Sequence, residues 1–170
     1  EGMYSIVTGN NLVGEWGGKC VGLQTSGEYA LISSNKILST HTICGRSVIS
    51  RGDYSEISGN ILTSTSRNAR LLEHDAKNCI LSRNVMEVLM AQSECRSGCG
   101  IYAAGGHCEG NLISENIIRQ VADCGIYARP EAGVLVNNRV FSYPETVAVA
   151  GPERRELGMK LDERNIRSLS

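Results

Sequence analysis

The chain has 170 residues and a net charge of −1, with 21% charged, 41% hydrophobic and only 5% aromatic residues. This balance, without any cluster of Lys and Arg, argues against a nucleic-acid or membrane-surface partner. No apolar stretch approaches the roughly 18 residues of a membrane-spanning helix. The 19 Gly provide turns, and residues 1–150 lack helical periodicity. The composition therefore favours an all-β chain.

Asparagines recur at intervals of 25, 25, 24, 32 and 22 residues. In each repeat an aliphatic residue stands three positions before the asparagine and another stands two positions after it. Units of this size cannot bury an apolar face alone, so they stack. The pattern predicts short parallel strands in which each residue lies about 4.8 Å from its counterpart. The repeating residues are Asn10, Asn35, Asn60, Asn84, Asn116 and Asn138.

Two apolar columns follow from this repeat, and we expect both to point into the core. The stacked asparagine amides are expected to hydrogen-bond from rung to rung. The column before the asparagine holds Val7, Ile32, Ile57, Leu81, Ile113, Leu135 and Leu161. The column after it holds Leu12, Ile37, Leu62, Met86, Ile118, Val140 and Ile166.

A further strand is expected ahead of each asparagine strand. Residues 99–103 and 124–128 share the sequence Cys-Gly-Ile-Tyr-Ala, and alternation turns Tyr102 and Tyr127 outward. The equivalent segments are 20–23, 47–49, 69–72 and 146–149. The long interval before Asn116 predicts a surface loop within residues 90–99. Residues 151–170 are interpreted as a degraded last rung or a C-terminal cap.

The Ile-x-x-Asn-x-Ile frame and the Gly-Ile-Tyr strands resemble the pectate-lyase-like superfamily over almost the whole chain. The resemblance implies an all-β, right-handed single-stranded parallel β-helix, a solenoid of about six to seven rungs. It implies a single domain over residues 1–170 and an extracellular, cell-surface or virion location. Because end rungs need polar caps and the strand frame is already present at Tyr4, we interpret the sequence as a piece of a longer chain.

Charged residues form two columns ahead of the asparagines. Side chains two positions apart lie on one side of an extended segment, so successive rungs present paired opposite charges along one edge. Such an array suits sugars and uronates, with Arg binding carboxylates, or it forms a solvated salt-bridge ladder. The outer column is Ser26, Arg51, Asp75, His107 and Arg129, and the inner column is Glu28, Asp53, Lys77, Glu109 and Glu131.

Catalytic residues are not identified by the sequence. Glu73, His74 and Asp75 include an imidazole and two acids, which suits general acid–base chemistry. Adjacent strand residues face opposite sides, however, so His74 shares a face with neither acid unless a turn intervenes. The resemblance would allow a polysaccharide lyase, hydrolase or epimerase, but the chain has no Asp-Asp, Asn-Thr-Asp or Gly-His-Gly motif.

Seven cysteines allow three interpretations. Cys20, Cys44, Cys99 and Cys124 stand just before the strands described above, which predicts a stacked column of buried thiols acting as small hydrophobes. A disulfide among Cys95, Cys99 and Cys108 is the second interpretation, and a metal site is the third. The spacings do not match those of zinc ligands, so we expect no metal and no cofactor.

Two functions remain after these steps. The first is a carbohydrate-directed module that binds, and could process, a polysaccharide or oligosaccharide on its outer face. The second is a structural rod without catalysis, such as part of a phage tailspike, fibre or surface decoration, in which a homo-oligomer such as a trimer is compatible. The candidate ligand residues are Tyr102, His107, Glu109, Tyr127, Arg129, Glu131, Asp75, Lys77, Arg51 and Asp53.

Overall fold

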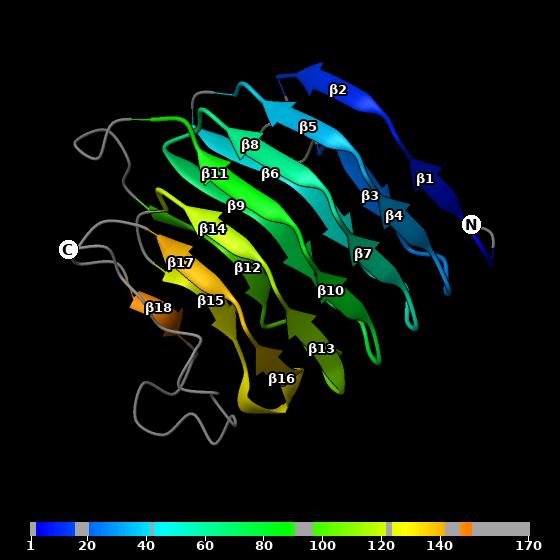
Figure 1. The fold of residues 1–170 in the computed structure, drawn as a ribbon. Helices are drawn as coiled ribbons and strands as arrows, with labels where there is room; N and C mark the ends of the chain where they lie inside the picture. The colour runs from blue at the N-terminus through cyan, green and yellow to red at the C-terminus, as the bar shows by residue number, and fades with distance from the viewer. Residues whose placement is uncertain are drawn as a thin grey trace.

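The computed structural model shows short strands that wind into a solenoid (Figure 1). It describes residues 3–15, 21–41, 43–90, 97–121, 124–141 and 147–150. The strands form three parallel sheets of six strands each, and the chain makes about five turns. These residues include one short 3-10 helix, η1 (Pro130–Ala132), and no helix that has the length and apolar character needed to cross a membrane. The all-β parallel solenoid confirms the predicted fold class.

Each rung contributes one strand to each sheet. The first sheet contains β1 (Ile6–Thr8), β4 (Leu31–Ser33), β7 (Glu56–Ser58), β10 (Ile80–Ser82), β13 (Asn111–Ser114) and β16 (Gly133–Val136). The second sheet contains β2 (Asn11–Gly14), β5 (Lys36–Ser39), β8 (Ile61–Ser64), β11 (Val85–Val88), β14 (Ile117–Arg119) and β17 (Arg139–Phe141). The third sheet contains β3 (Leu23–Thr25), β6 (Cys44–Ser50), β9 (Asn68–His74), β12 (Ser97–Ala103), β15 (Cys124–Ala128) and β18 (Val147–Ala150).

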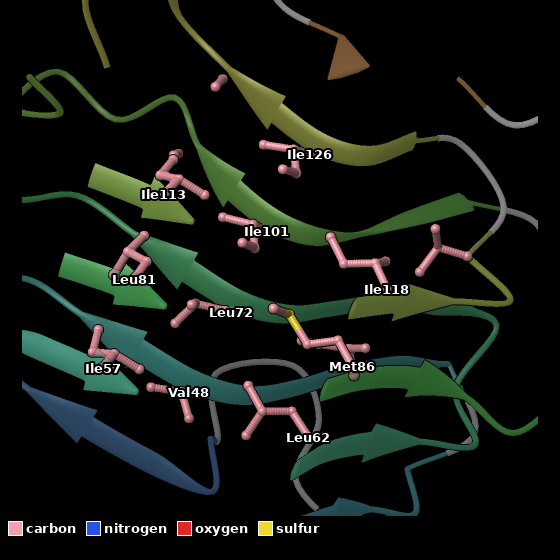
Figure 2. Packing of buried hydrophobic residues seen from close by; sticks show 14 of the residues in the cluster. Val48, Ile57, Leu62, Leu72, Leu81, Met86, Ile101, Ile113, Ile118 and Ile126 are labelled. Carbon is pink, nitrogen blue, oxygen red and sulfur yellow. The ribbon is translucent and has the colours of Figure 1, made fainter. Parts of the chain in front are cut away.

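The predicted apolar columns lie in the core between the sheets. Ile57 of β7 aligns with Leu81 of β10, and Leu81 aligns with Ile113 of β13. All three side chains are fully buried, as are their neighbours in the other two sheets (Figure 2). The core also includes Leu62, Met86 and Ile118 from the second sheet and Leu72, Ile101 and Ile126 from the third. Leu161 and Ile166 lie outside the described residues.

The asparagines form a hydrogen-bonded ladder at the corner between the first and second sheets. The Asn60 Oδ1 accepts hydrogen bonds from the backbone N–H and from Nδ2 of Asn35, both at 3.0 Å. The Asn60 Nδ2 donates to Asn84 Oδ1 and to the Ile32 carbonyl, both at 2.9 Å. Asn84 and Asn116 repeat these contacts in the next rungs. The predicted ladder is confirmed.

A second ladder, which the sequence did not indicate, lies at the corner before the first sheet. The Ser55 Oγ accepts the Ala30 N–H at 3.0 Å, and the Cys79 Sγ accepts the Ser55 N–H at 3.3 Å. The Asn111 Oδ1 then accepts the Cys79 N–H at 2.8 Å. Three different residue types thus satisfy the same backbone donor in successive rungs, and so this column has no sequence signature.

The prediction of one loop within residues 90–99 is partly wrong. Ser64 and Asn68 lie four positions apart, whereas their partners Val88 and Ser97 lie nine apart. Glu73 and Ile80 are separated by seven positions, whereas Tyr102 and Leu112 are separated by ten. Five extra residues therefore enter between β11 and β12, and three more enter between β12 and β13. Residues 91–96 lie outside the described parts.

The predicted column of four cysteines is also partly wrong. Cys99 aligns with Cys124, but Cys44 aligns with Asn68, which aligns with Ser97. Cys44 therefore lies two positions ahead of the Cys99 column. Cys20 and Cys95 are not among the described residues.

Four thiols are buried, which supports the interpretation of cysteines as small core residues. They are Cys79, Cys99, Cys108 and Cys124. Burial raises the pKa of Cys79 to about 11 and that of Cys108 to about 12. Both are therefore neutral thiols at physiological pH. Cys99 and Cys108 do not form the alternative disulfide.

We expect Asn60→Ala to lower the free energy of unfolding by about 1–3 kcal/mol, because it leaves the Asn35 donors and the Ile32 carbonyl without partners in a buried corner. Asn10 is the matched control, since its side chain is exposed at the first rung. Asn10→Ala should cost about 0.5 kcal/mol or less. Urea unfolding monitored by circular dichroism measures both. Equal losses in the two variants would contradict a cooperative buried ladder.

Neighbouring residues of β13 test the assignment of the two faces. Ile113→Asp should destabilise the chain by about 4 kcal/mol, because it places an unpaired carboxylate in the core. Leu112 points the other way and is 39% exposed, so Leu112→Asp should cost less than about 1 kcal/mol. The same urea experiment applies. A near-neutral Ile113→Asp would show that the inward column is wrongly assigned.

Candidate functional site

A half-open groove of about 270 Å³ lies at the corner between the third and first sheets. Its lining residues come from successive rungs and are almost all polar or charged. The groove brings together five of the predicted ligand residues, Arg51, Asp53, Asp75, Lys77 and His107. Ser26, Glu28 and Gly52 complete the lining.

The backbone fixes two carboxylates of this groove. The Asp53 Oδ1 accepts the Lys77 N–H at 2.8 Å, and the Asp75 Oδ1 accepts the His107 N–H at 3.0 Å. Each acid is therefore held in place by a backbone N–H of the following rung. Gly105 permits this arrangement, because a Cβ at that position would lie 1.9 Å from the Asp75 Oδ1.

Two charge pairs along this edge fit the predicted salt-bridge ladder. The Lys77 ammonium contacts the Glu109 carboxylate, and this hydrogen bond raises the pKa of Lys77. Arg129 Nη1 lies 4.0 Å from Glu131 Oε1, and both side chains are exposed. Glu109, Arg129 and Glu131 do not line the groove. Exposed pairs of this kind contribute little to stability.

Tyr102 and Tyr127 stack on each other outside the groove. Their ring centroids are 5.2 Å apart and their planes differ by 3°. The Arg70 guanidinium carbon lies 4.0 Å from the centroid of the Tyr102 ring. Arg70 also pairs with Glu73 at 3.5 Å. Tyr102 therefore contacts both Arg70 and Tyr127, and its role as a ligand residue stays a prediction.

A different tyrosine row borders the groove. The rings of Tyr4, Tyr29 and Tyr54 stack with centroids 5.2 Å apart, and their side chains are 70%, 42% and 51% exposed. Tyr29 directly follows Glu28, and Tyr54 directly follows Asp53 in the groove lining. Because the faces cover one another, the row presents ring edges and phenol groups to solvent.

The backbone of the tyrosine row is strained. Tyr4, Tyr29 and Tyr54 have φ values of 66°, 56° and 57°, which bulky residues rarely adopt. The equivalent turn positions in later rungs are Asn78 and Gly110, residue types that tolerate this conformation. The sequence signal was present, since each tyrosine stands six positions before an asparagine. The tyrosine row was not predicted from the sequence.

The residues Glu73, His74 and Asp75 do not form a catalytic group. His74 is 1% exposed and points into the interior, whereas Glu73 pairs with Arg46 at 3.4 Å on the outside. Asp75 lines the groove. The predicted separation of His74 from the two acids by alternation is therefore observed. Across the described ranges, no three His, Cys, Asp or Glu side chains are grouped closely enough to hold a metal ion.

Comparison with known proteins gave no match to a protein-family profile, to a curated protein or to a solved structure.

The buried His74 predicts a pH dependence of stability. Burial lowers the pKa of His74 below its ordinary 6.5. The unfolded chain therefore binds a proton below pH 6.5 that the folded chain does not, and stability falls as the pH falls. For one proton the loss is at most about 1.4 kcal/mol per pH unit. His74→Gln should reduce the loss of unfolding free energy between pH 7 and pH 5, measured with urea.

His107→Gln is the matched control, because it also removes one imidazole, but from an exposed position. It should keep the wild-type dependence. If His74→Gln loses as much stability on acidification as the wild type, His74 is not the titrating group.

Proposed function

We propose that this solenoid is a carbohydrate-binding β-helix module that holds an oligosaccharide or polysaccharide along the corner between its third and first sheets. The observation that carries the proposal is the groove lined by charged side chains from successive rungs. It lies beside exposed tyrosines, which are frequent in sugar-binding surfaces because they combine an apolar ring with a polar group.

The groove chemistry suits a polyhydroxylated chain. Asp53 and Asp75 are held in place by backbone N–H groups and accept hydrogen bonds from sugar hydroxyls. Arg51 supplies a planar set of donors that fits a uronate carboxylate in a bidentate contact. The rung spacing of about 4.8 Å is close to the length of one saccharide unit, so successive rungs would contact successive sugars.

Membership of the pectate-lyase-like superfamily and an extracellular or surface location belong to the same proposal. Cleavage of a glycosidic bond is not part of this proposal, because no residue of the groove is identified as a catalytic base or nucleophile. An activity as lyase, hydrolase or epimerase therefore needs its own assay. Incubation of the chain with polysaccharides, followed by chromatography of the products, provides it.

The second candidate function is a structural rod. It is supported by the asparagine ladder, which runs from Asn10 to Asn138 and connects six successive rungs of the described residues. Such a continuous ladder gives mechanical rigidity along the solenoid axis, with or without a ligand. A rod of this kind would bind no saccharide, and this difference separates it from the first proposal.

We expect calorimetric titration with neutral and uronate oligosaccharides to detect binding by the wild-type chain. Arg51→Gln and Asp75→Asn should each weaken that binding by about tenfold or more, through loss of a charge-assisted hydrogen bond. Asp75→Asn keeps the Oδ1 acceptor for His107 and so preserves the turn. Arg139→Gln is the control, because this exposed arginine lies on β17 of the second sheet.

Unchanged affinity in both groove variants would place the sugar elsewhere. Absence of binding to every oligosaccharide would favour the structural rod.

A further inference from the structure

The outer face of the first sheet carries a row of aliphatic side chains, which we call the aliphatic row. The register aligns one residue from each of the six strands, and five of the six are aliphatic. Leu31 and Glu56 are partly buried, but the other members are 39% to 70% exposed. The row consists of Ile6, Leu31, Glu56, Ile80, Leu112 and Val134.

Uncharged side chains flank this row on both sides. Two positions later along each strand stand the hydroxyl residues Thr8, Ser33, Ser58, Ser82 and Ser114, followed by Val136. The tyrosine row stands two positions earlier, in the turns before β1, β4 and β7. Glu56 is the one charged residue in the aliphatic and hydroxyl columns of these strands, although 21% of the chain is charged. The charges gather instead at the neighbouring groove.

The size of this face is in the range of a protein interface. Six strands spaced about 4.8 Å apart make it about 24 Å long, and five residues make it roughly 16 Å wide. With side-chain relief, its accessible area is on the order of 600 Å², which approaches the roughly 800 Å² that each partner buries in a standard interface. An exposed aliphatic row that crosses a face of this size and is flanked by uncharged side chains is typical of an interaction surface.

We propose that the aliphatic row is the interface between two copies of this chain, packed face to face through their first sheets. A flat row with one residue per rung is complementary to itself, because a second row with the same spacing can pack against it rung for rung. The face carries almost no charge, so pairing it with itself leaves few ions to be desolvated. This inference is independent of the proposed sugar groove.

Glu56 determines the orientation of the two copies. It occupies the third place in the row and Ile80 the fourth. With the two solenoid axes parallel, each Glu56 would lie opposite its counterpart, and the two carboxylates would repel each other. With the axes antiparallel, Glu56 lies opposite Ile80 of the second copy. The antiparallel two-fold arrangement is therefore favoured, and Glu56 limits its strength.

Sedimentation velocity and equilibrium over a concentration series test the proposal. The wild-type chain should show a reversible monomer–dimer equilibrium in the micromolar range, as expected for an interface at the small end of the specific class. Ile80→Lys should weaken dimerisation at least tenfold. Glu56→Ile should strengthen it at least threefold, because it removes the one charge in the row.

Ile61→Lys is the matched control. Ile61 is 40% exposed on β8 of the second sheet, and Ile80 is 41% exposed on β10 of the first. The two substitutions remove the same side chain at nearly equal exposure, and circular dichroism checks that both variants fold. Dimerisation should be unchanged in Ile61→Lys.

Three results would overturn the proposal. The first is a wild-type chain that stays monomeric at all concentrations, which would mean that something other than a second copy covers the row. The second is an Ile61→Lys variant that loses dimerisation as strongly as Ile80→Lys. The third is a Glu56→Ile variant with weaker association than the wild type.

Discussion

Hydrogen bonds between rungs are the constraint on which this structure depends. At the corner between the first and second sheets the chain turns away from both strands, and its backbone polar groups lose their strand partners. The Asn60 amide provides them, because it accepts from the rung before it and donates to the rung after it. Each asparagine needs both neighbours, so one rung alone would leave buried polar groups unsatisfied. The aliphatic core can form only because the corners are satisfied in this way.

The fold could be predicted because the same side chain performs the same task in every rung. Ile57, Leu81 and Ile113 occupy one column, and their common type reveals the inward face directly. The second ladder shows the opposite case. Ser55, Cys79 and Asn111 all accept a backbone N–H, but a hydroxyl, a thiol and an amide have no shared sequence pattern. A column can thus be recognised in the sequence only when chemically similar side chains occupy it in every rung.

The candidate site shows a similar limit. Arg51, Asp53 and Lys77 could be grouped from the sequence because residues two apart share a side and rungs stack. The surroundings of Tyr102 could not be predicted, because its ring is covered by Arg70, a residue 32 positions away on the adjacent strand. The prediction that Cys44 shares a column with Cys99 and Cys124 was wrong for a related reason. Counting back from the asparagine ignores the differing lengths of the corners, which the strand register resolves.

The division of the long interval has a consequence for how this chain can vary. Extra residues enter at two corners, after β11 and after β12, yet β10 and β13 keep their alignment. Strand pairing therefore does not depend on the length of a corner. The entropic free-energy cost of lengthening a corner rises only slowly with the number of added residues. The corner after β12 carries His107 into the groove. It is thus a natural grafting position, where a new peptide could be displayed beside the groove while the scaffold stays intact.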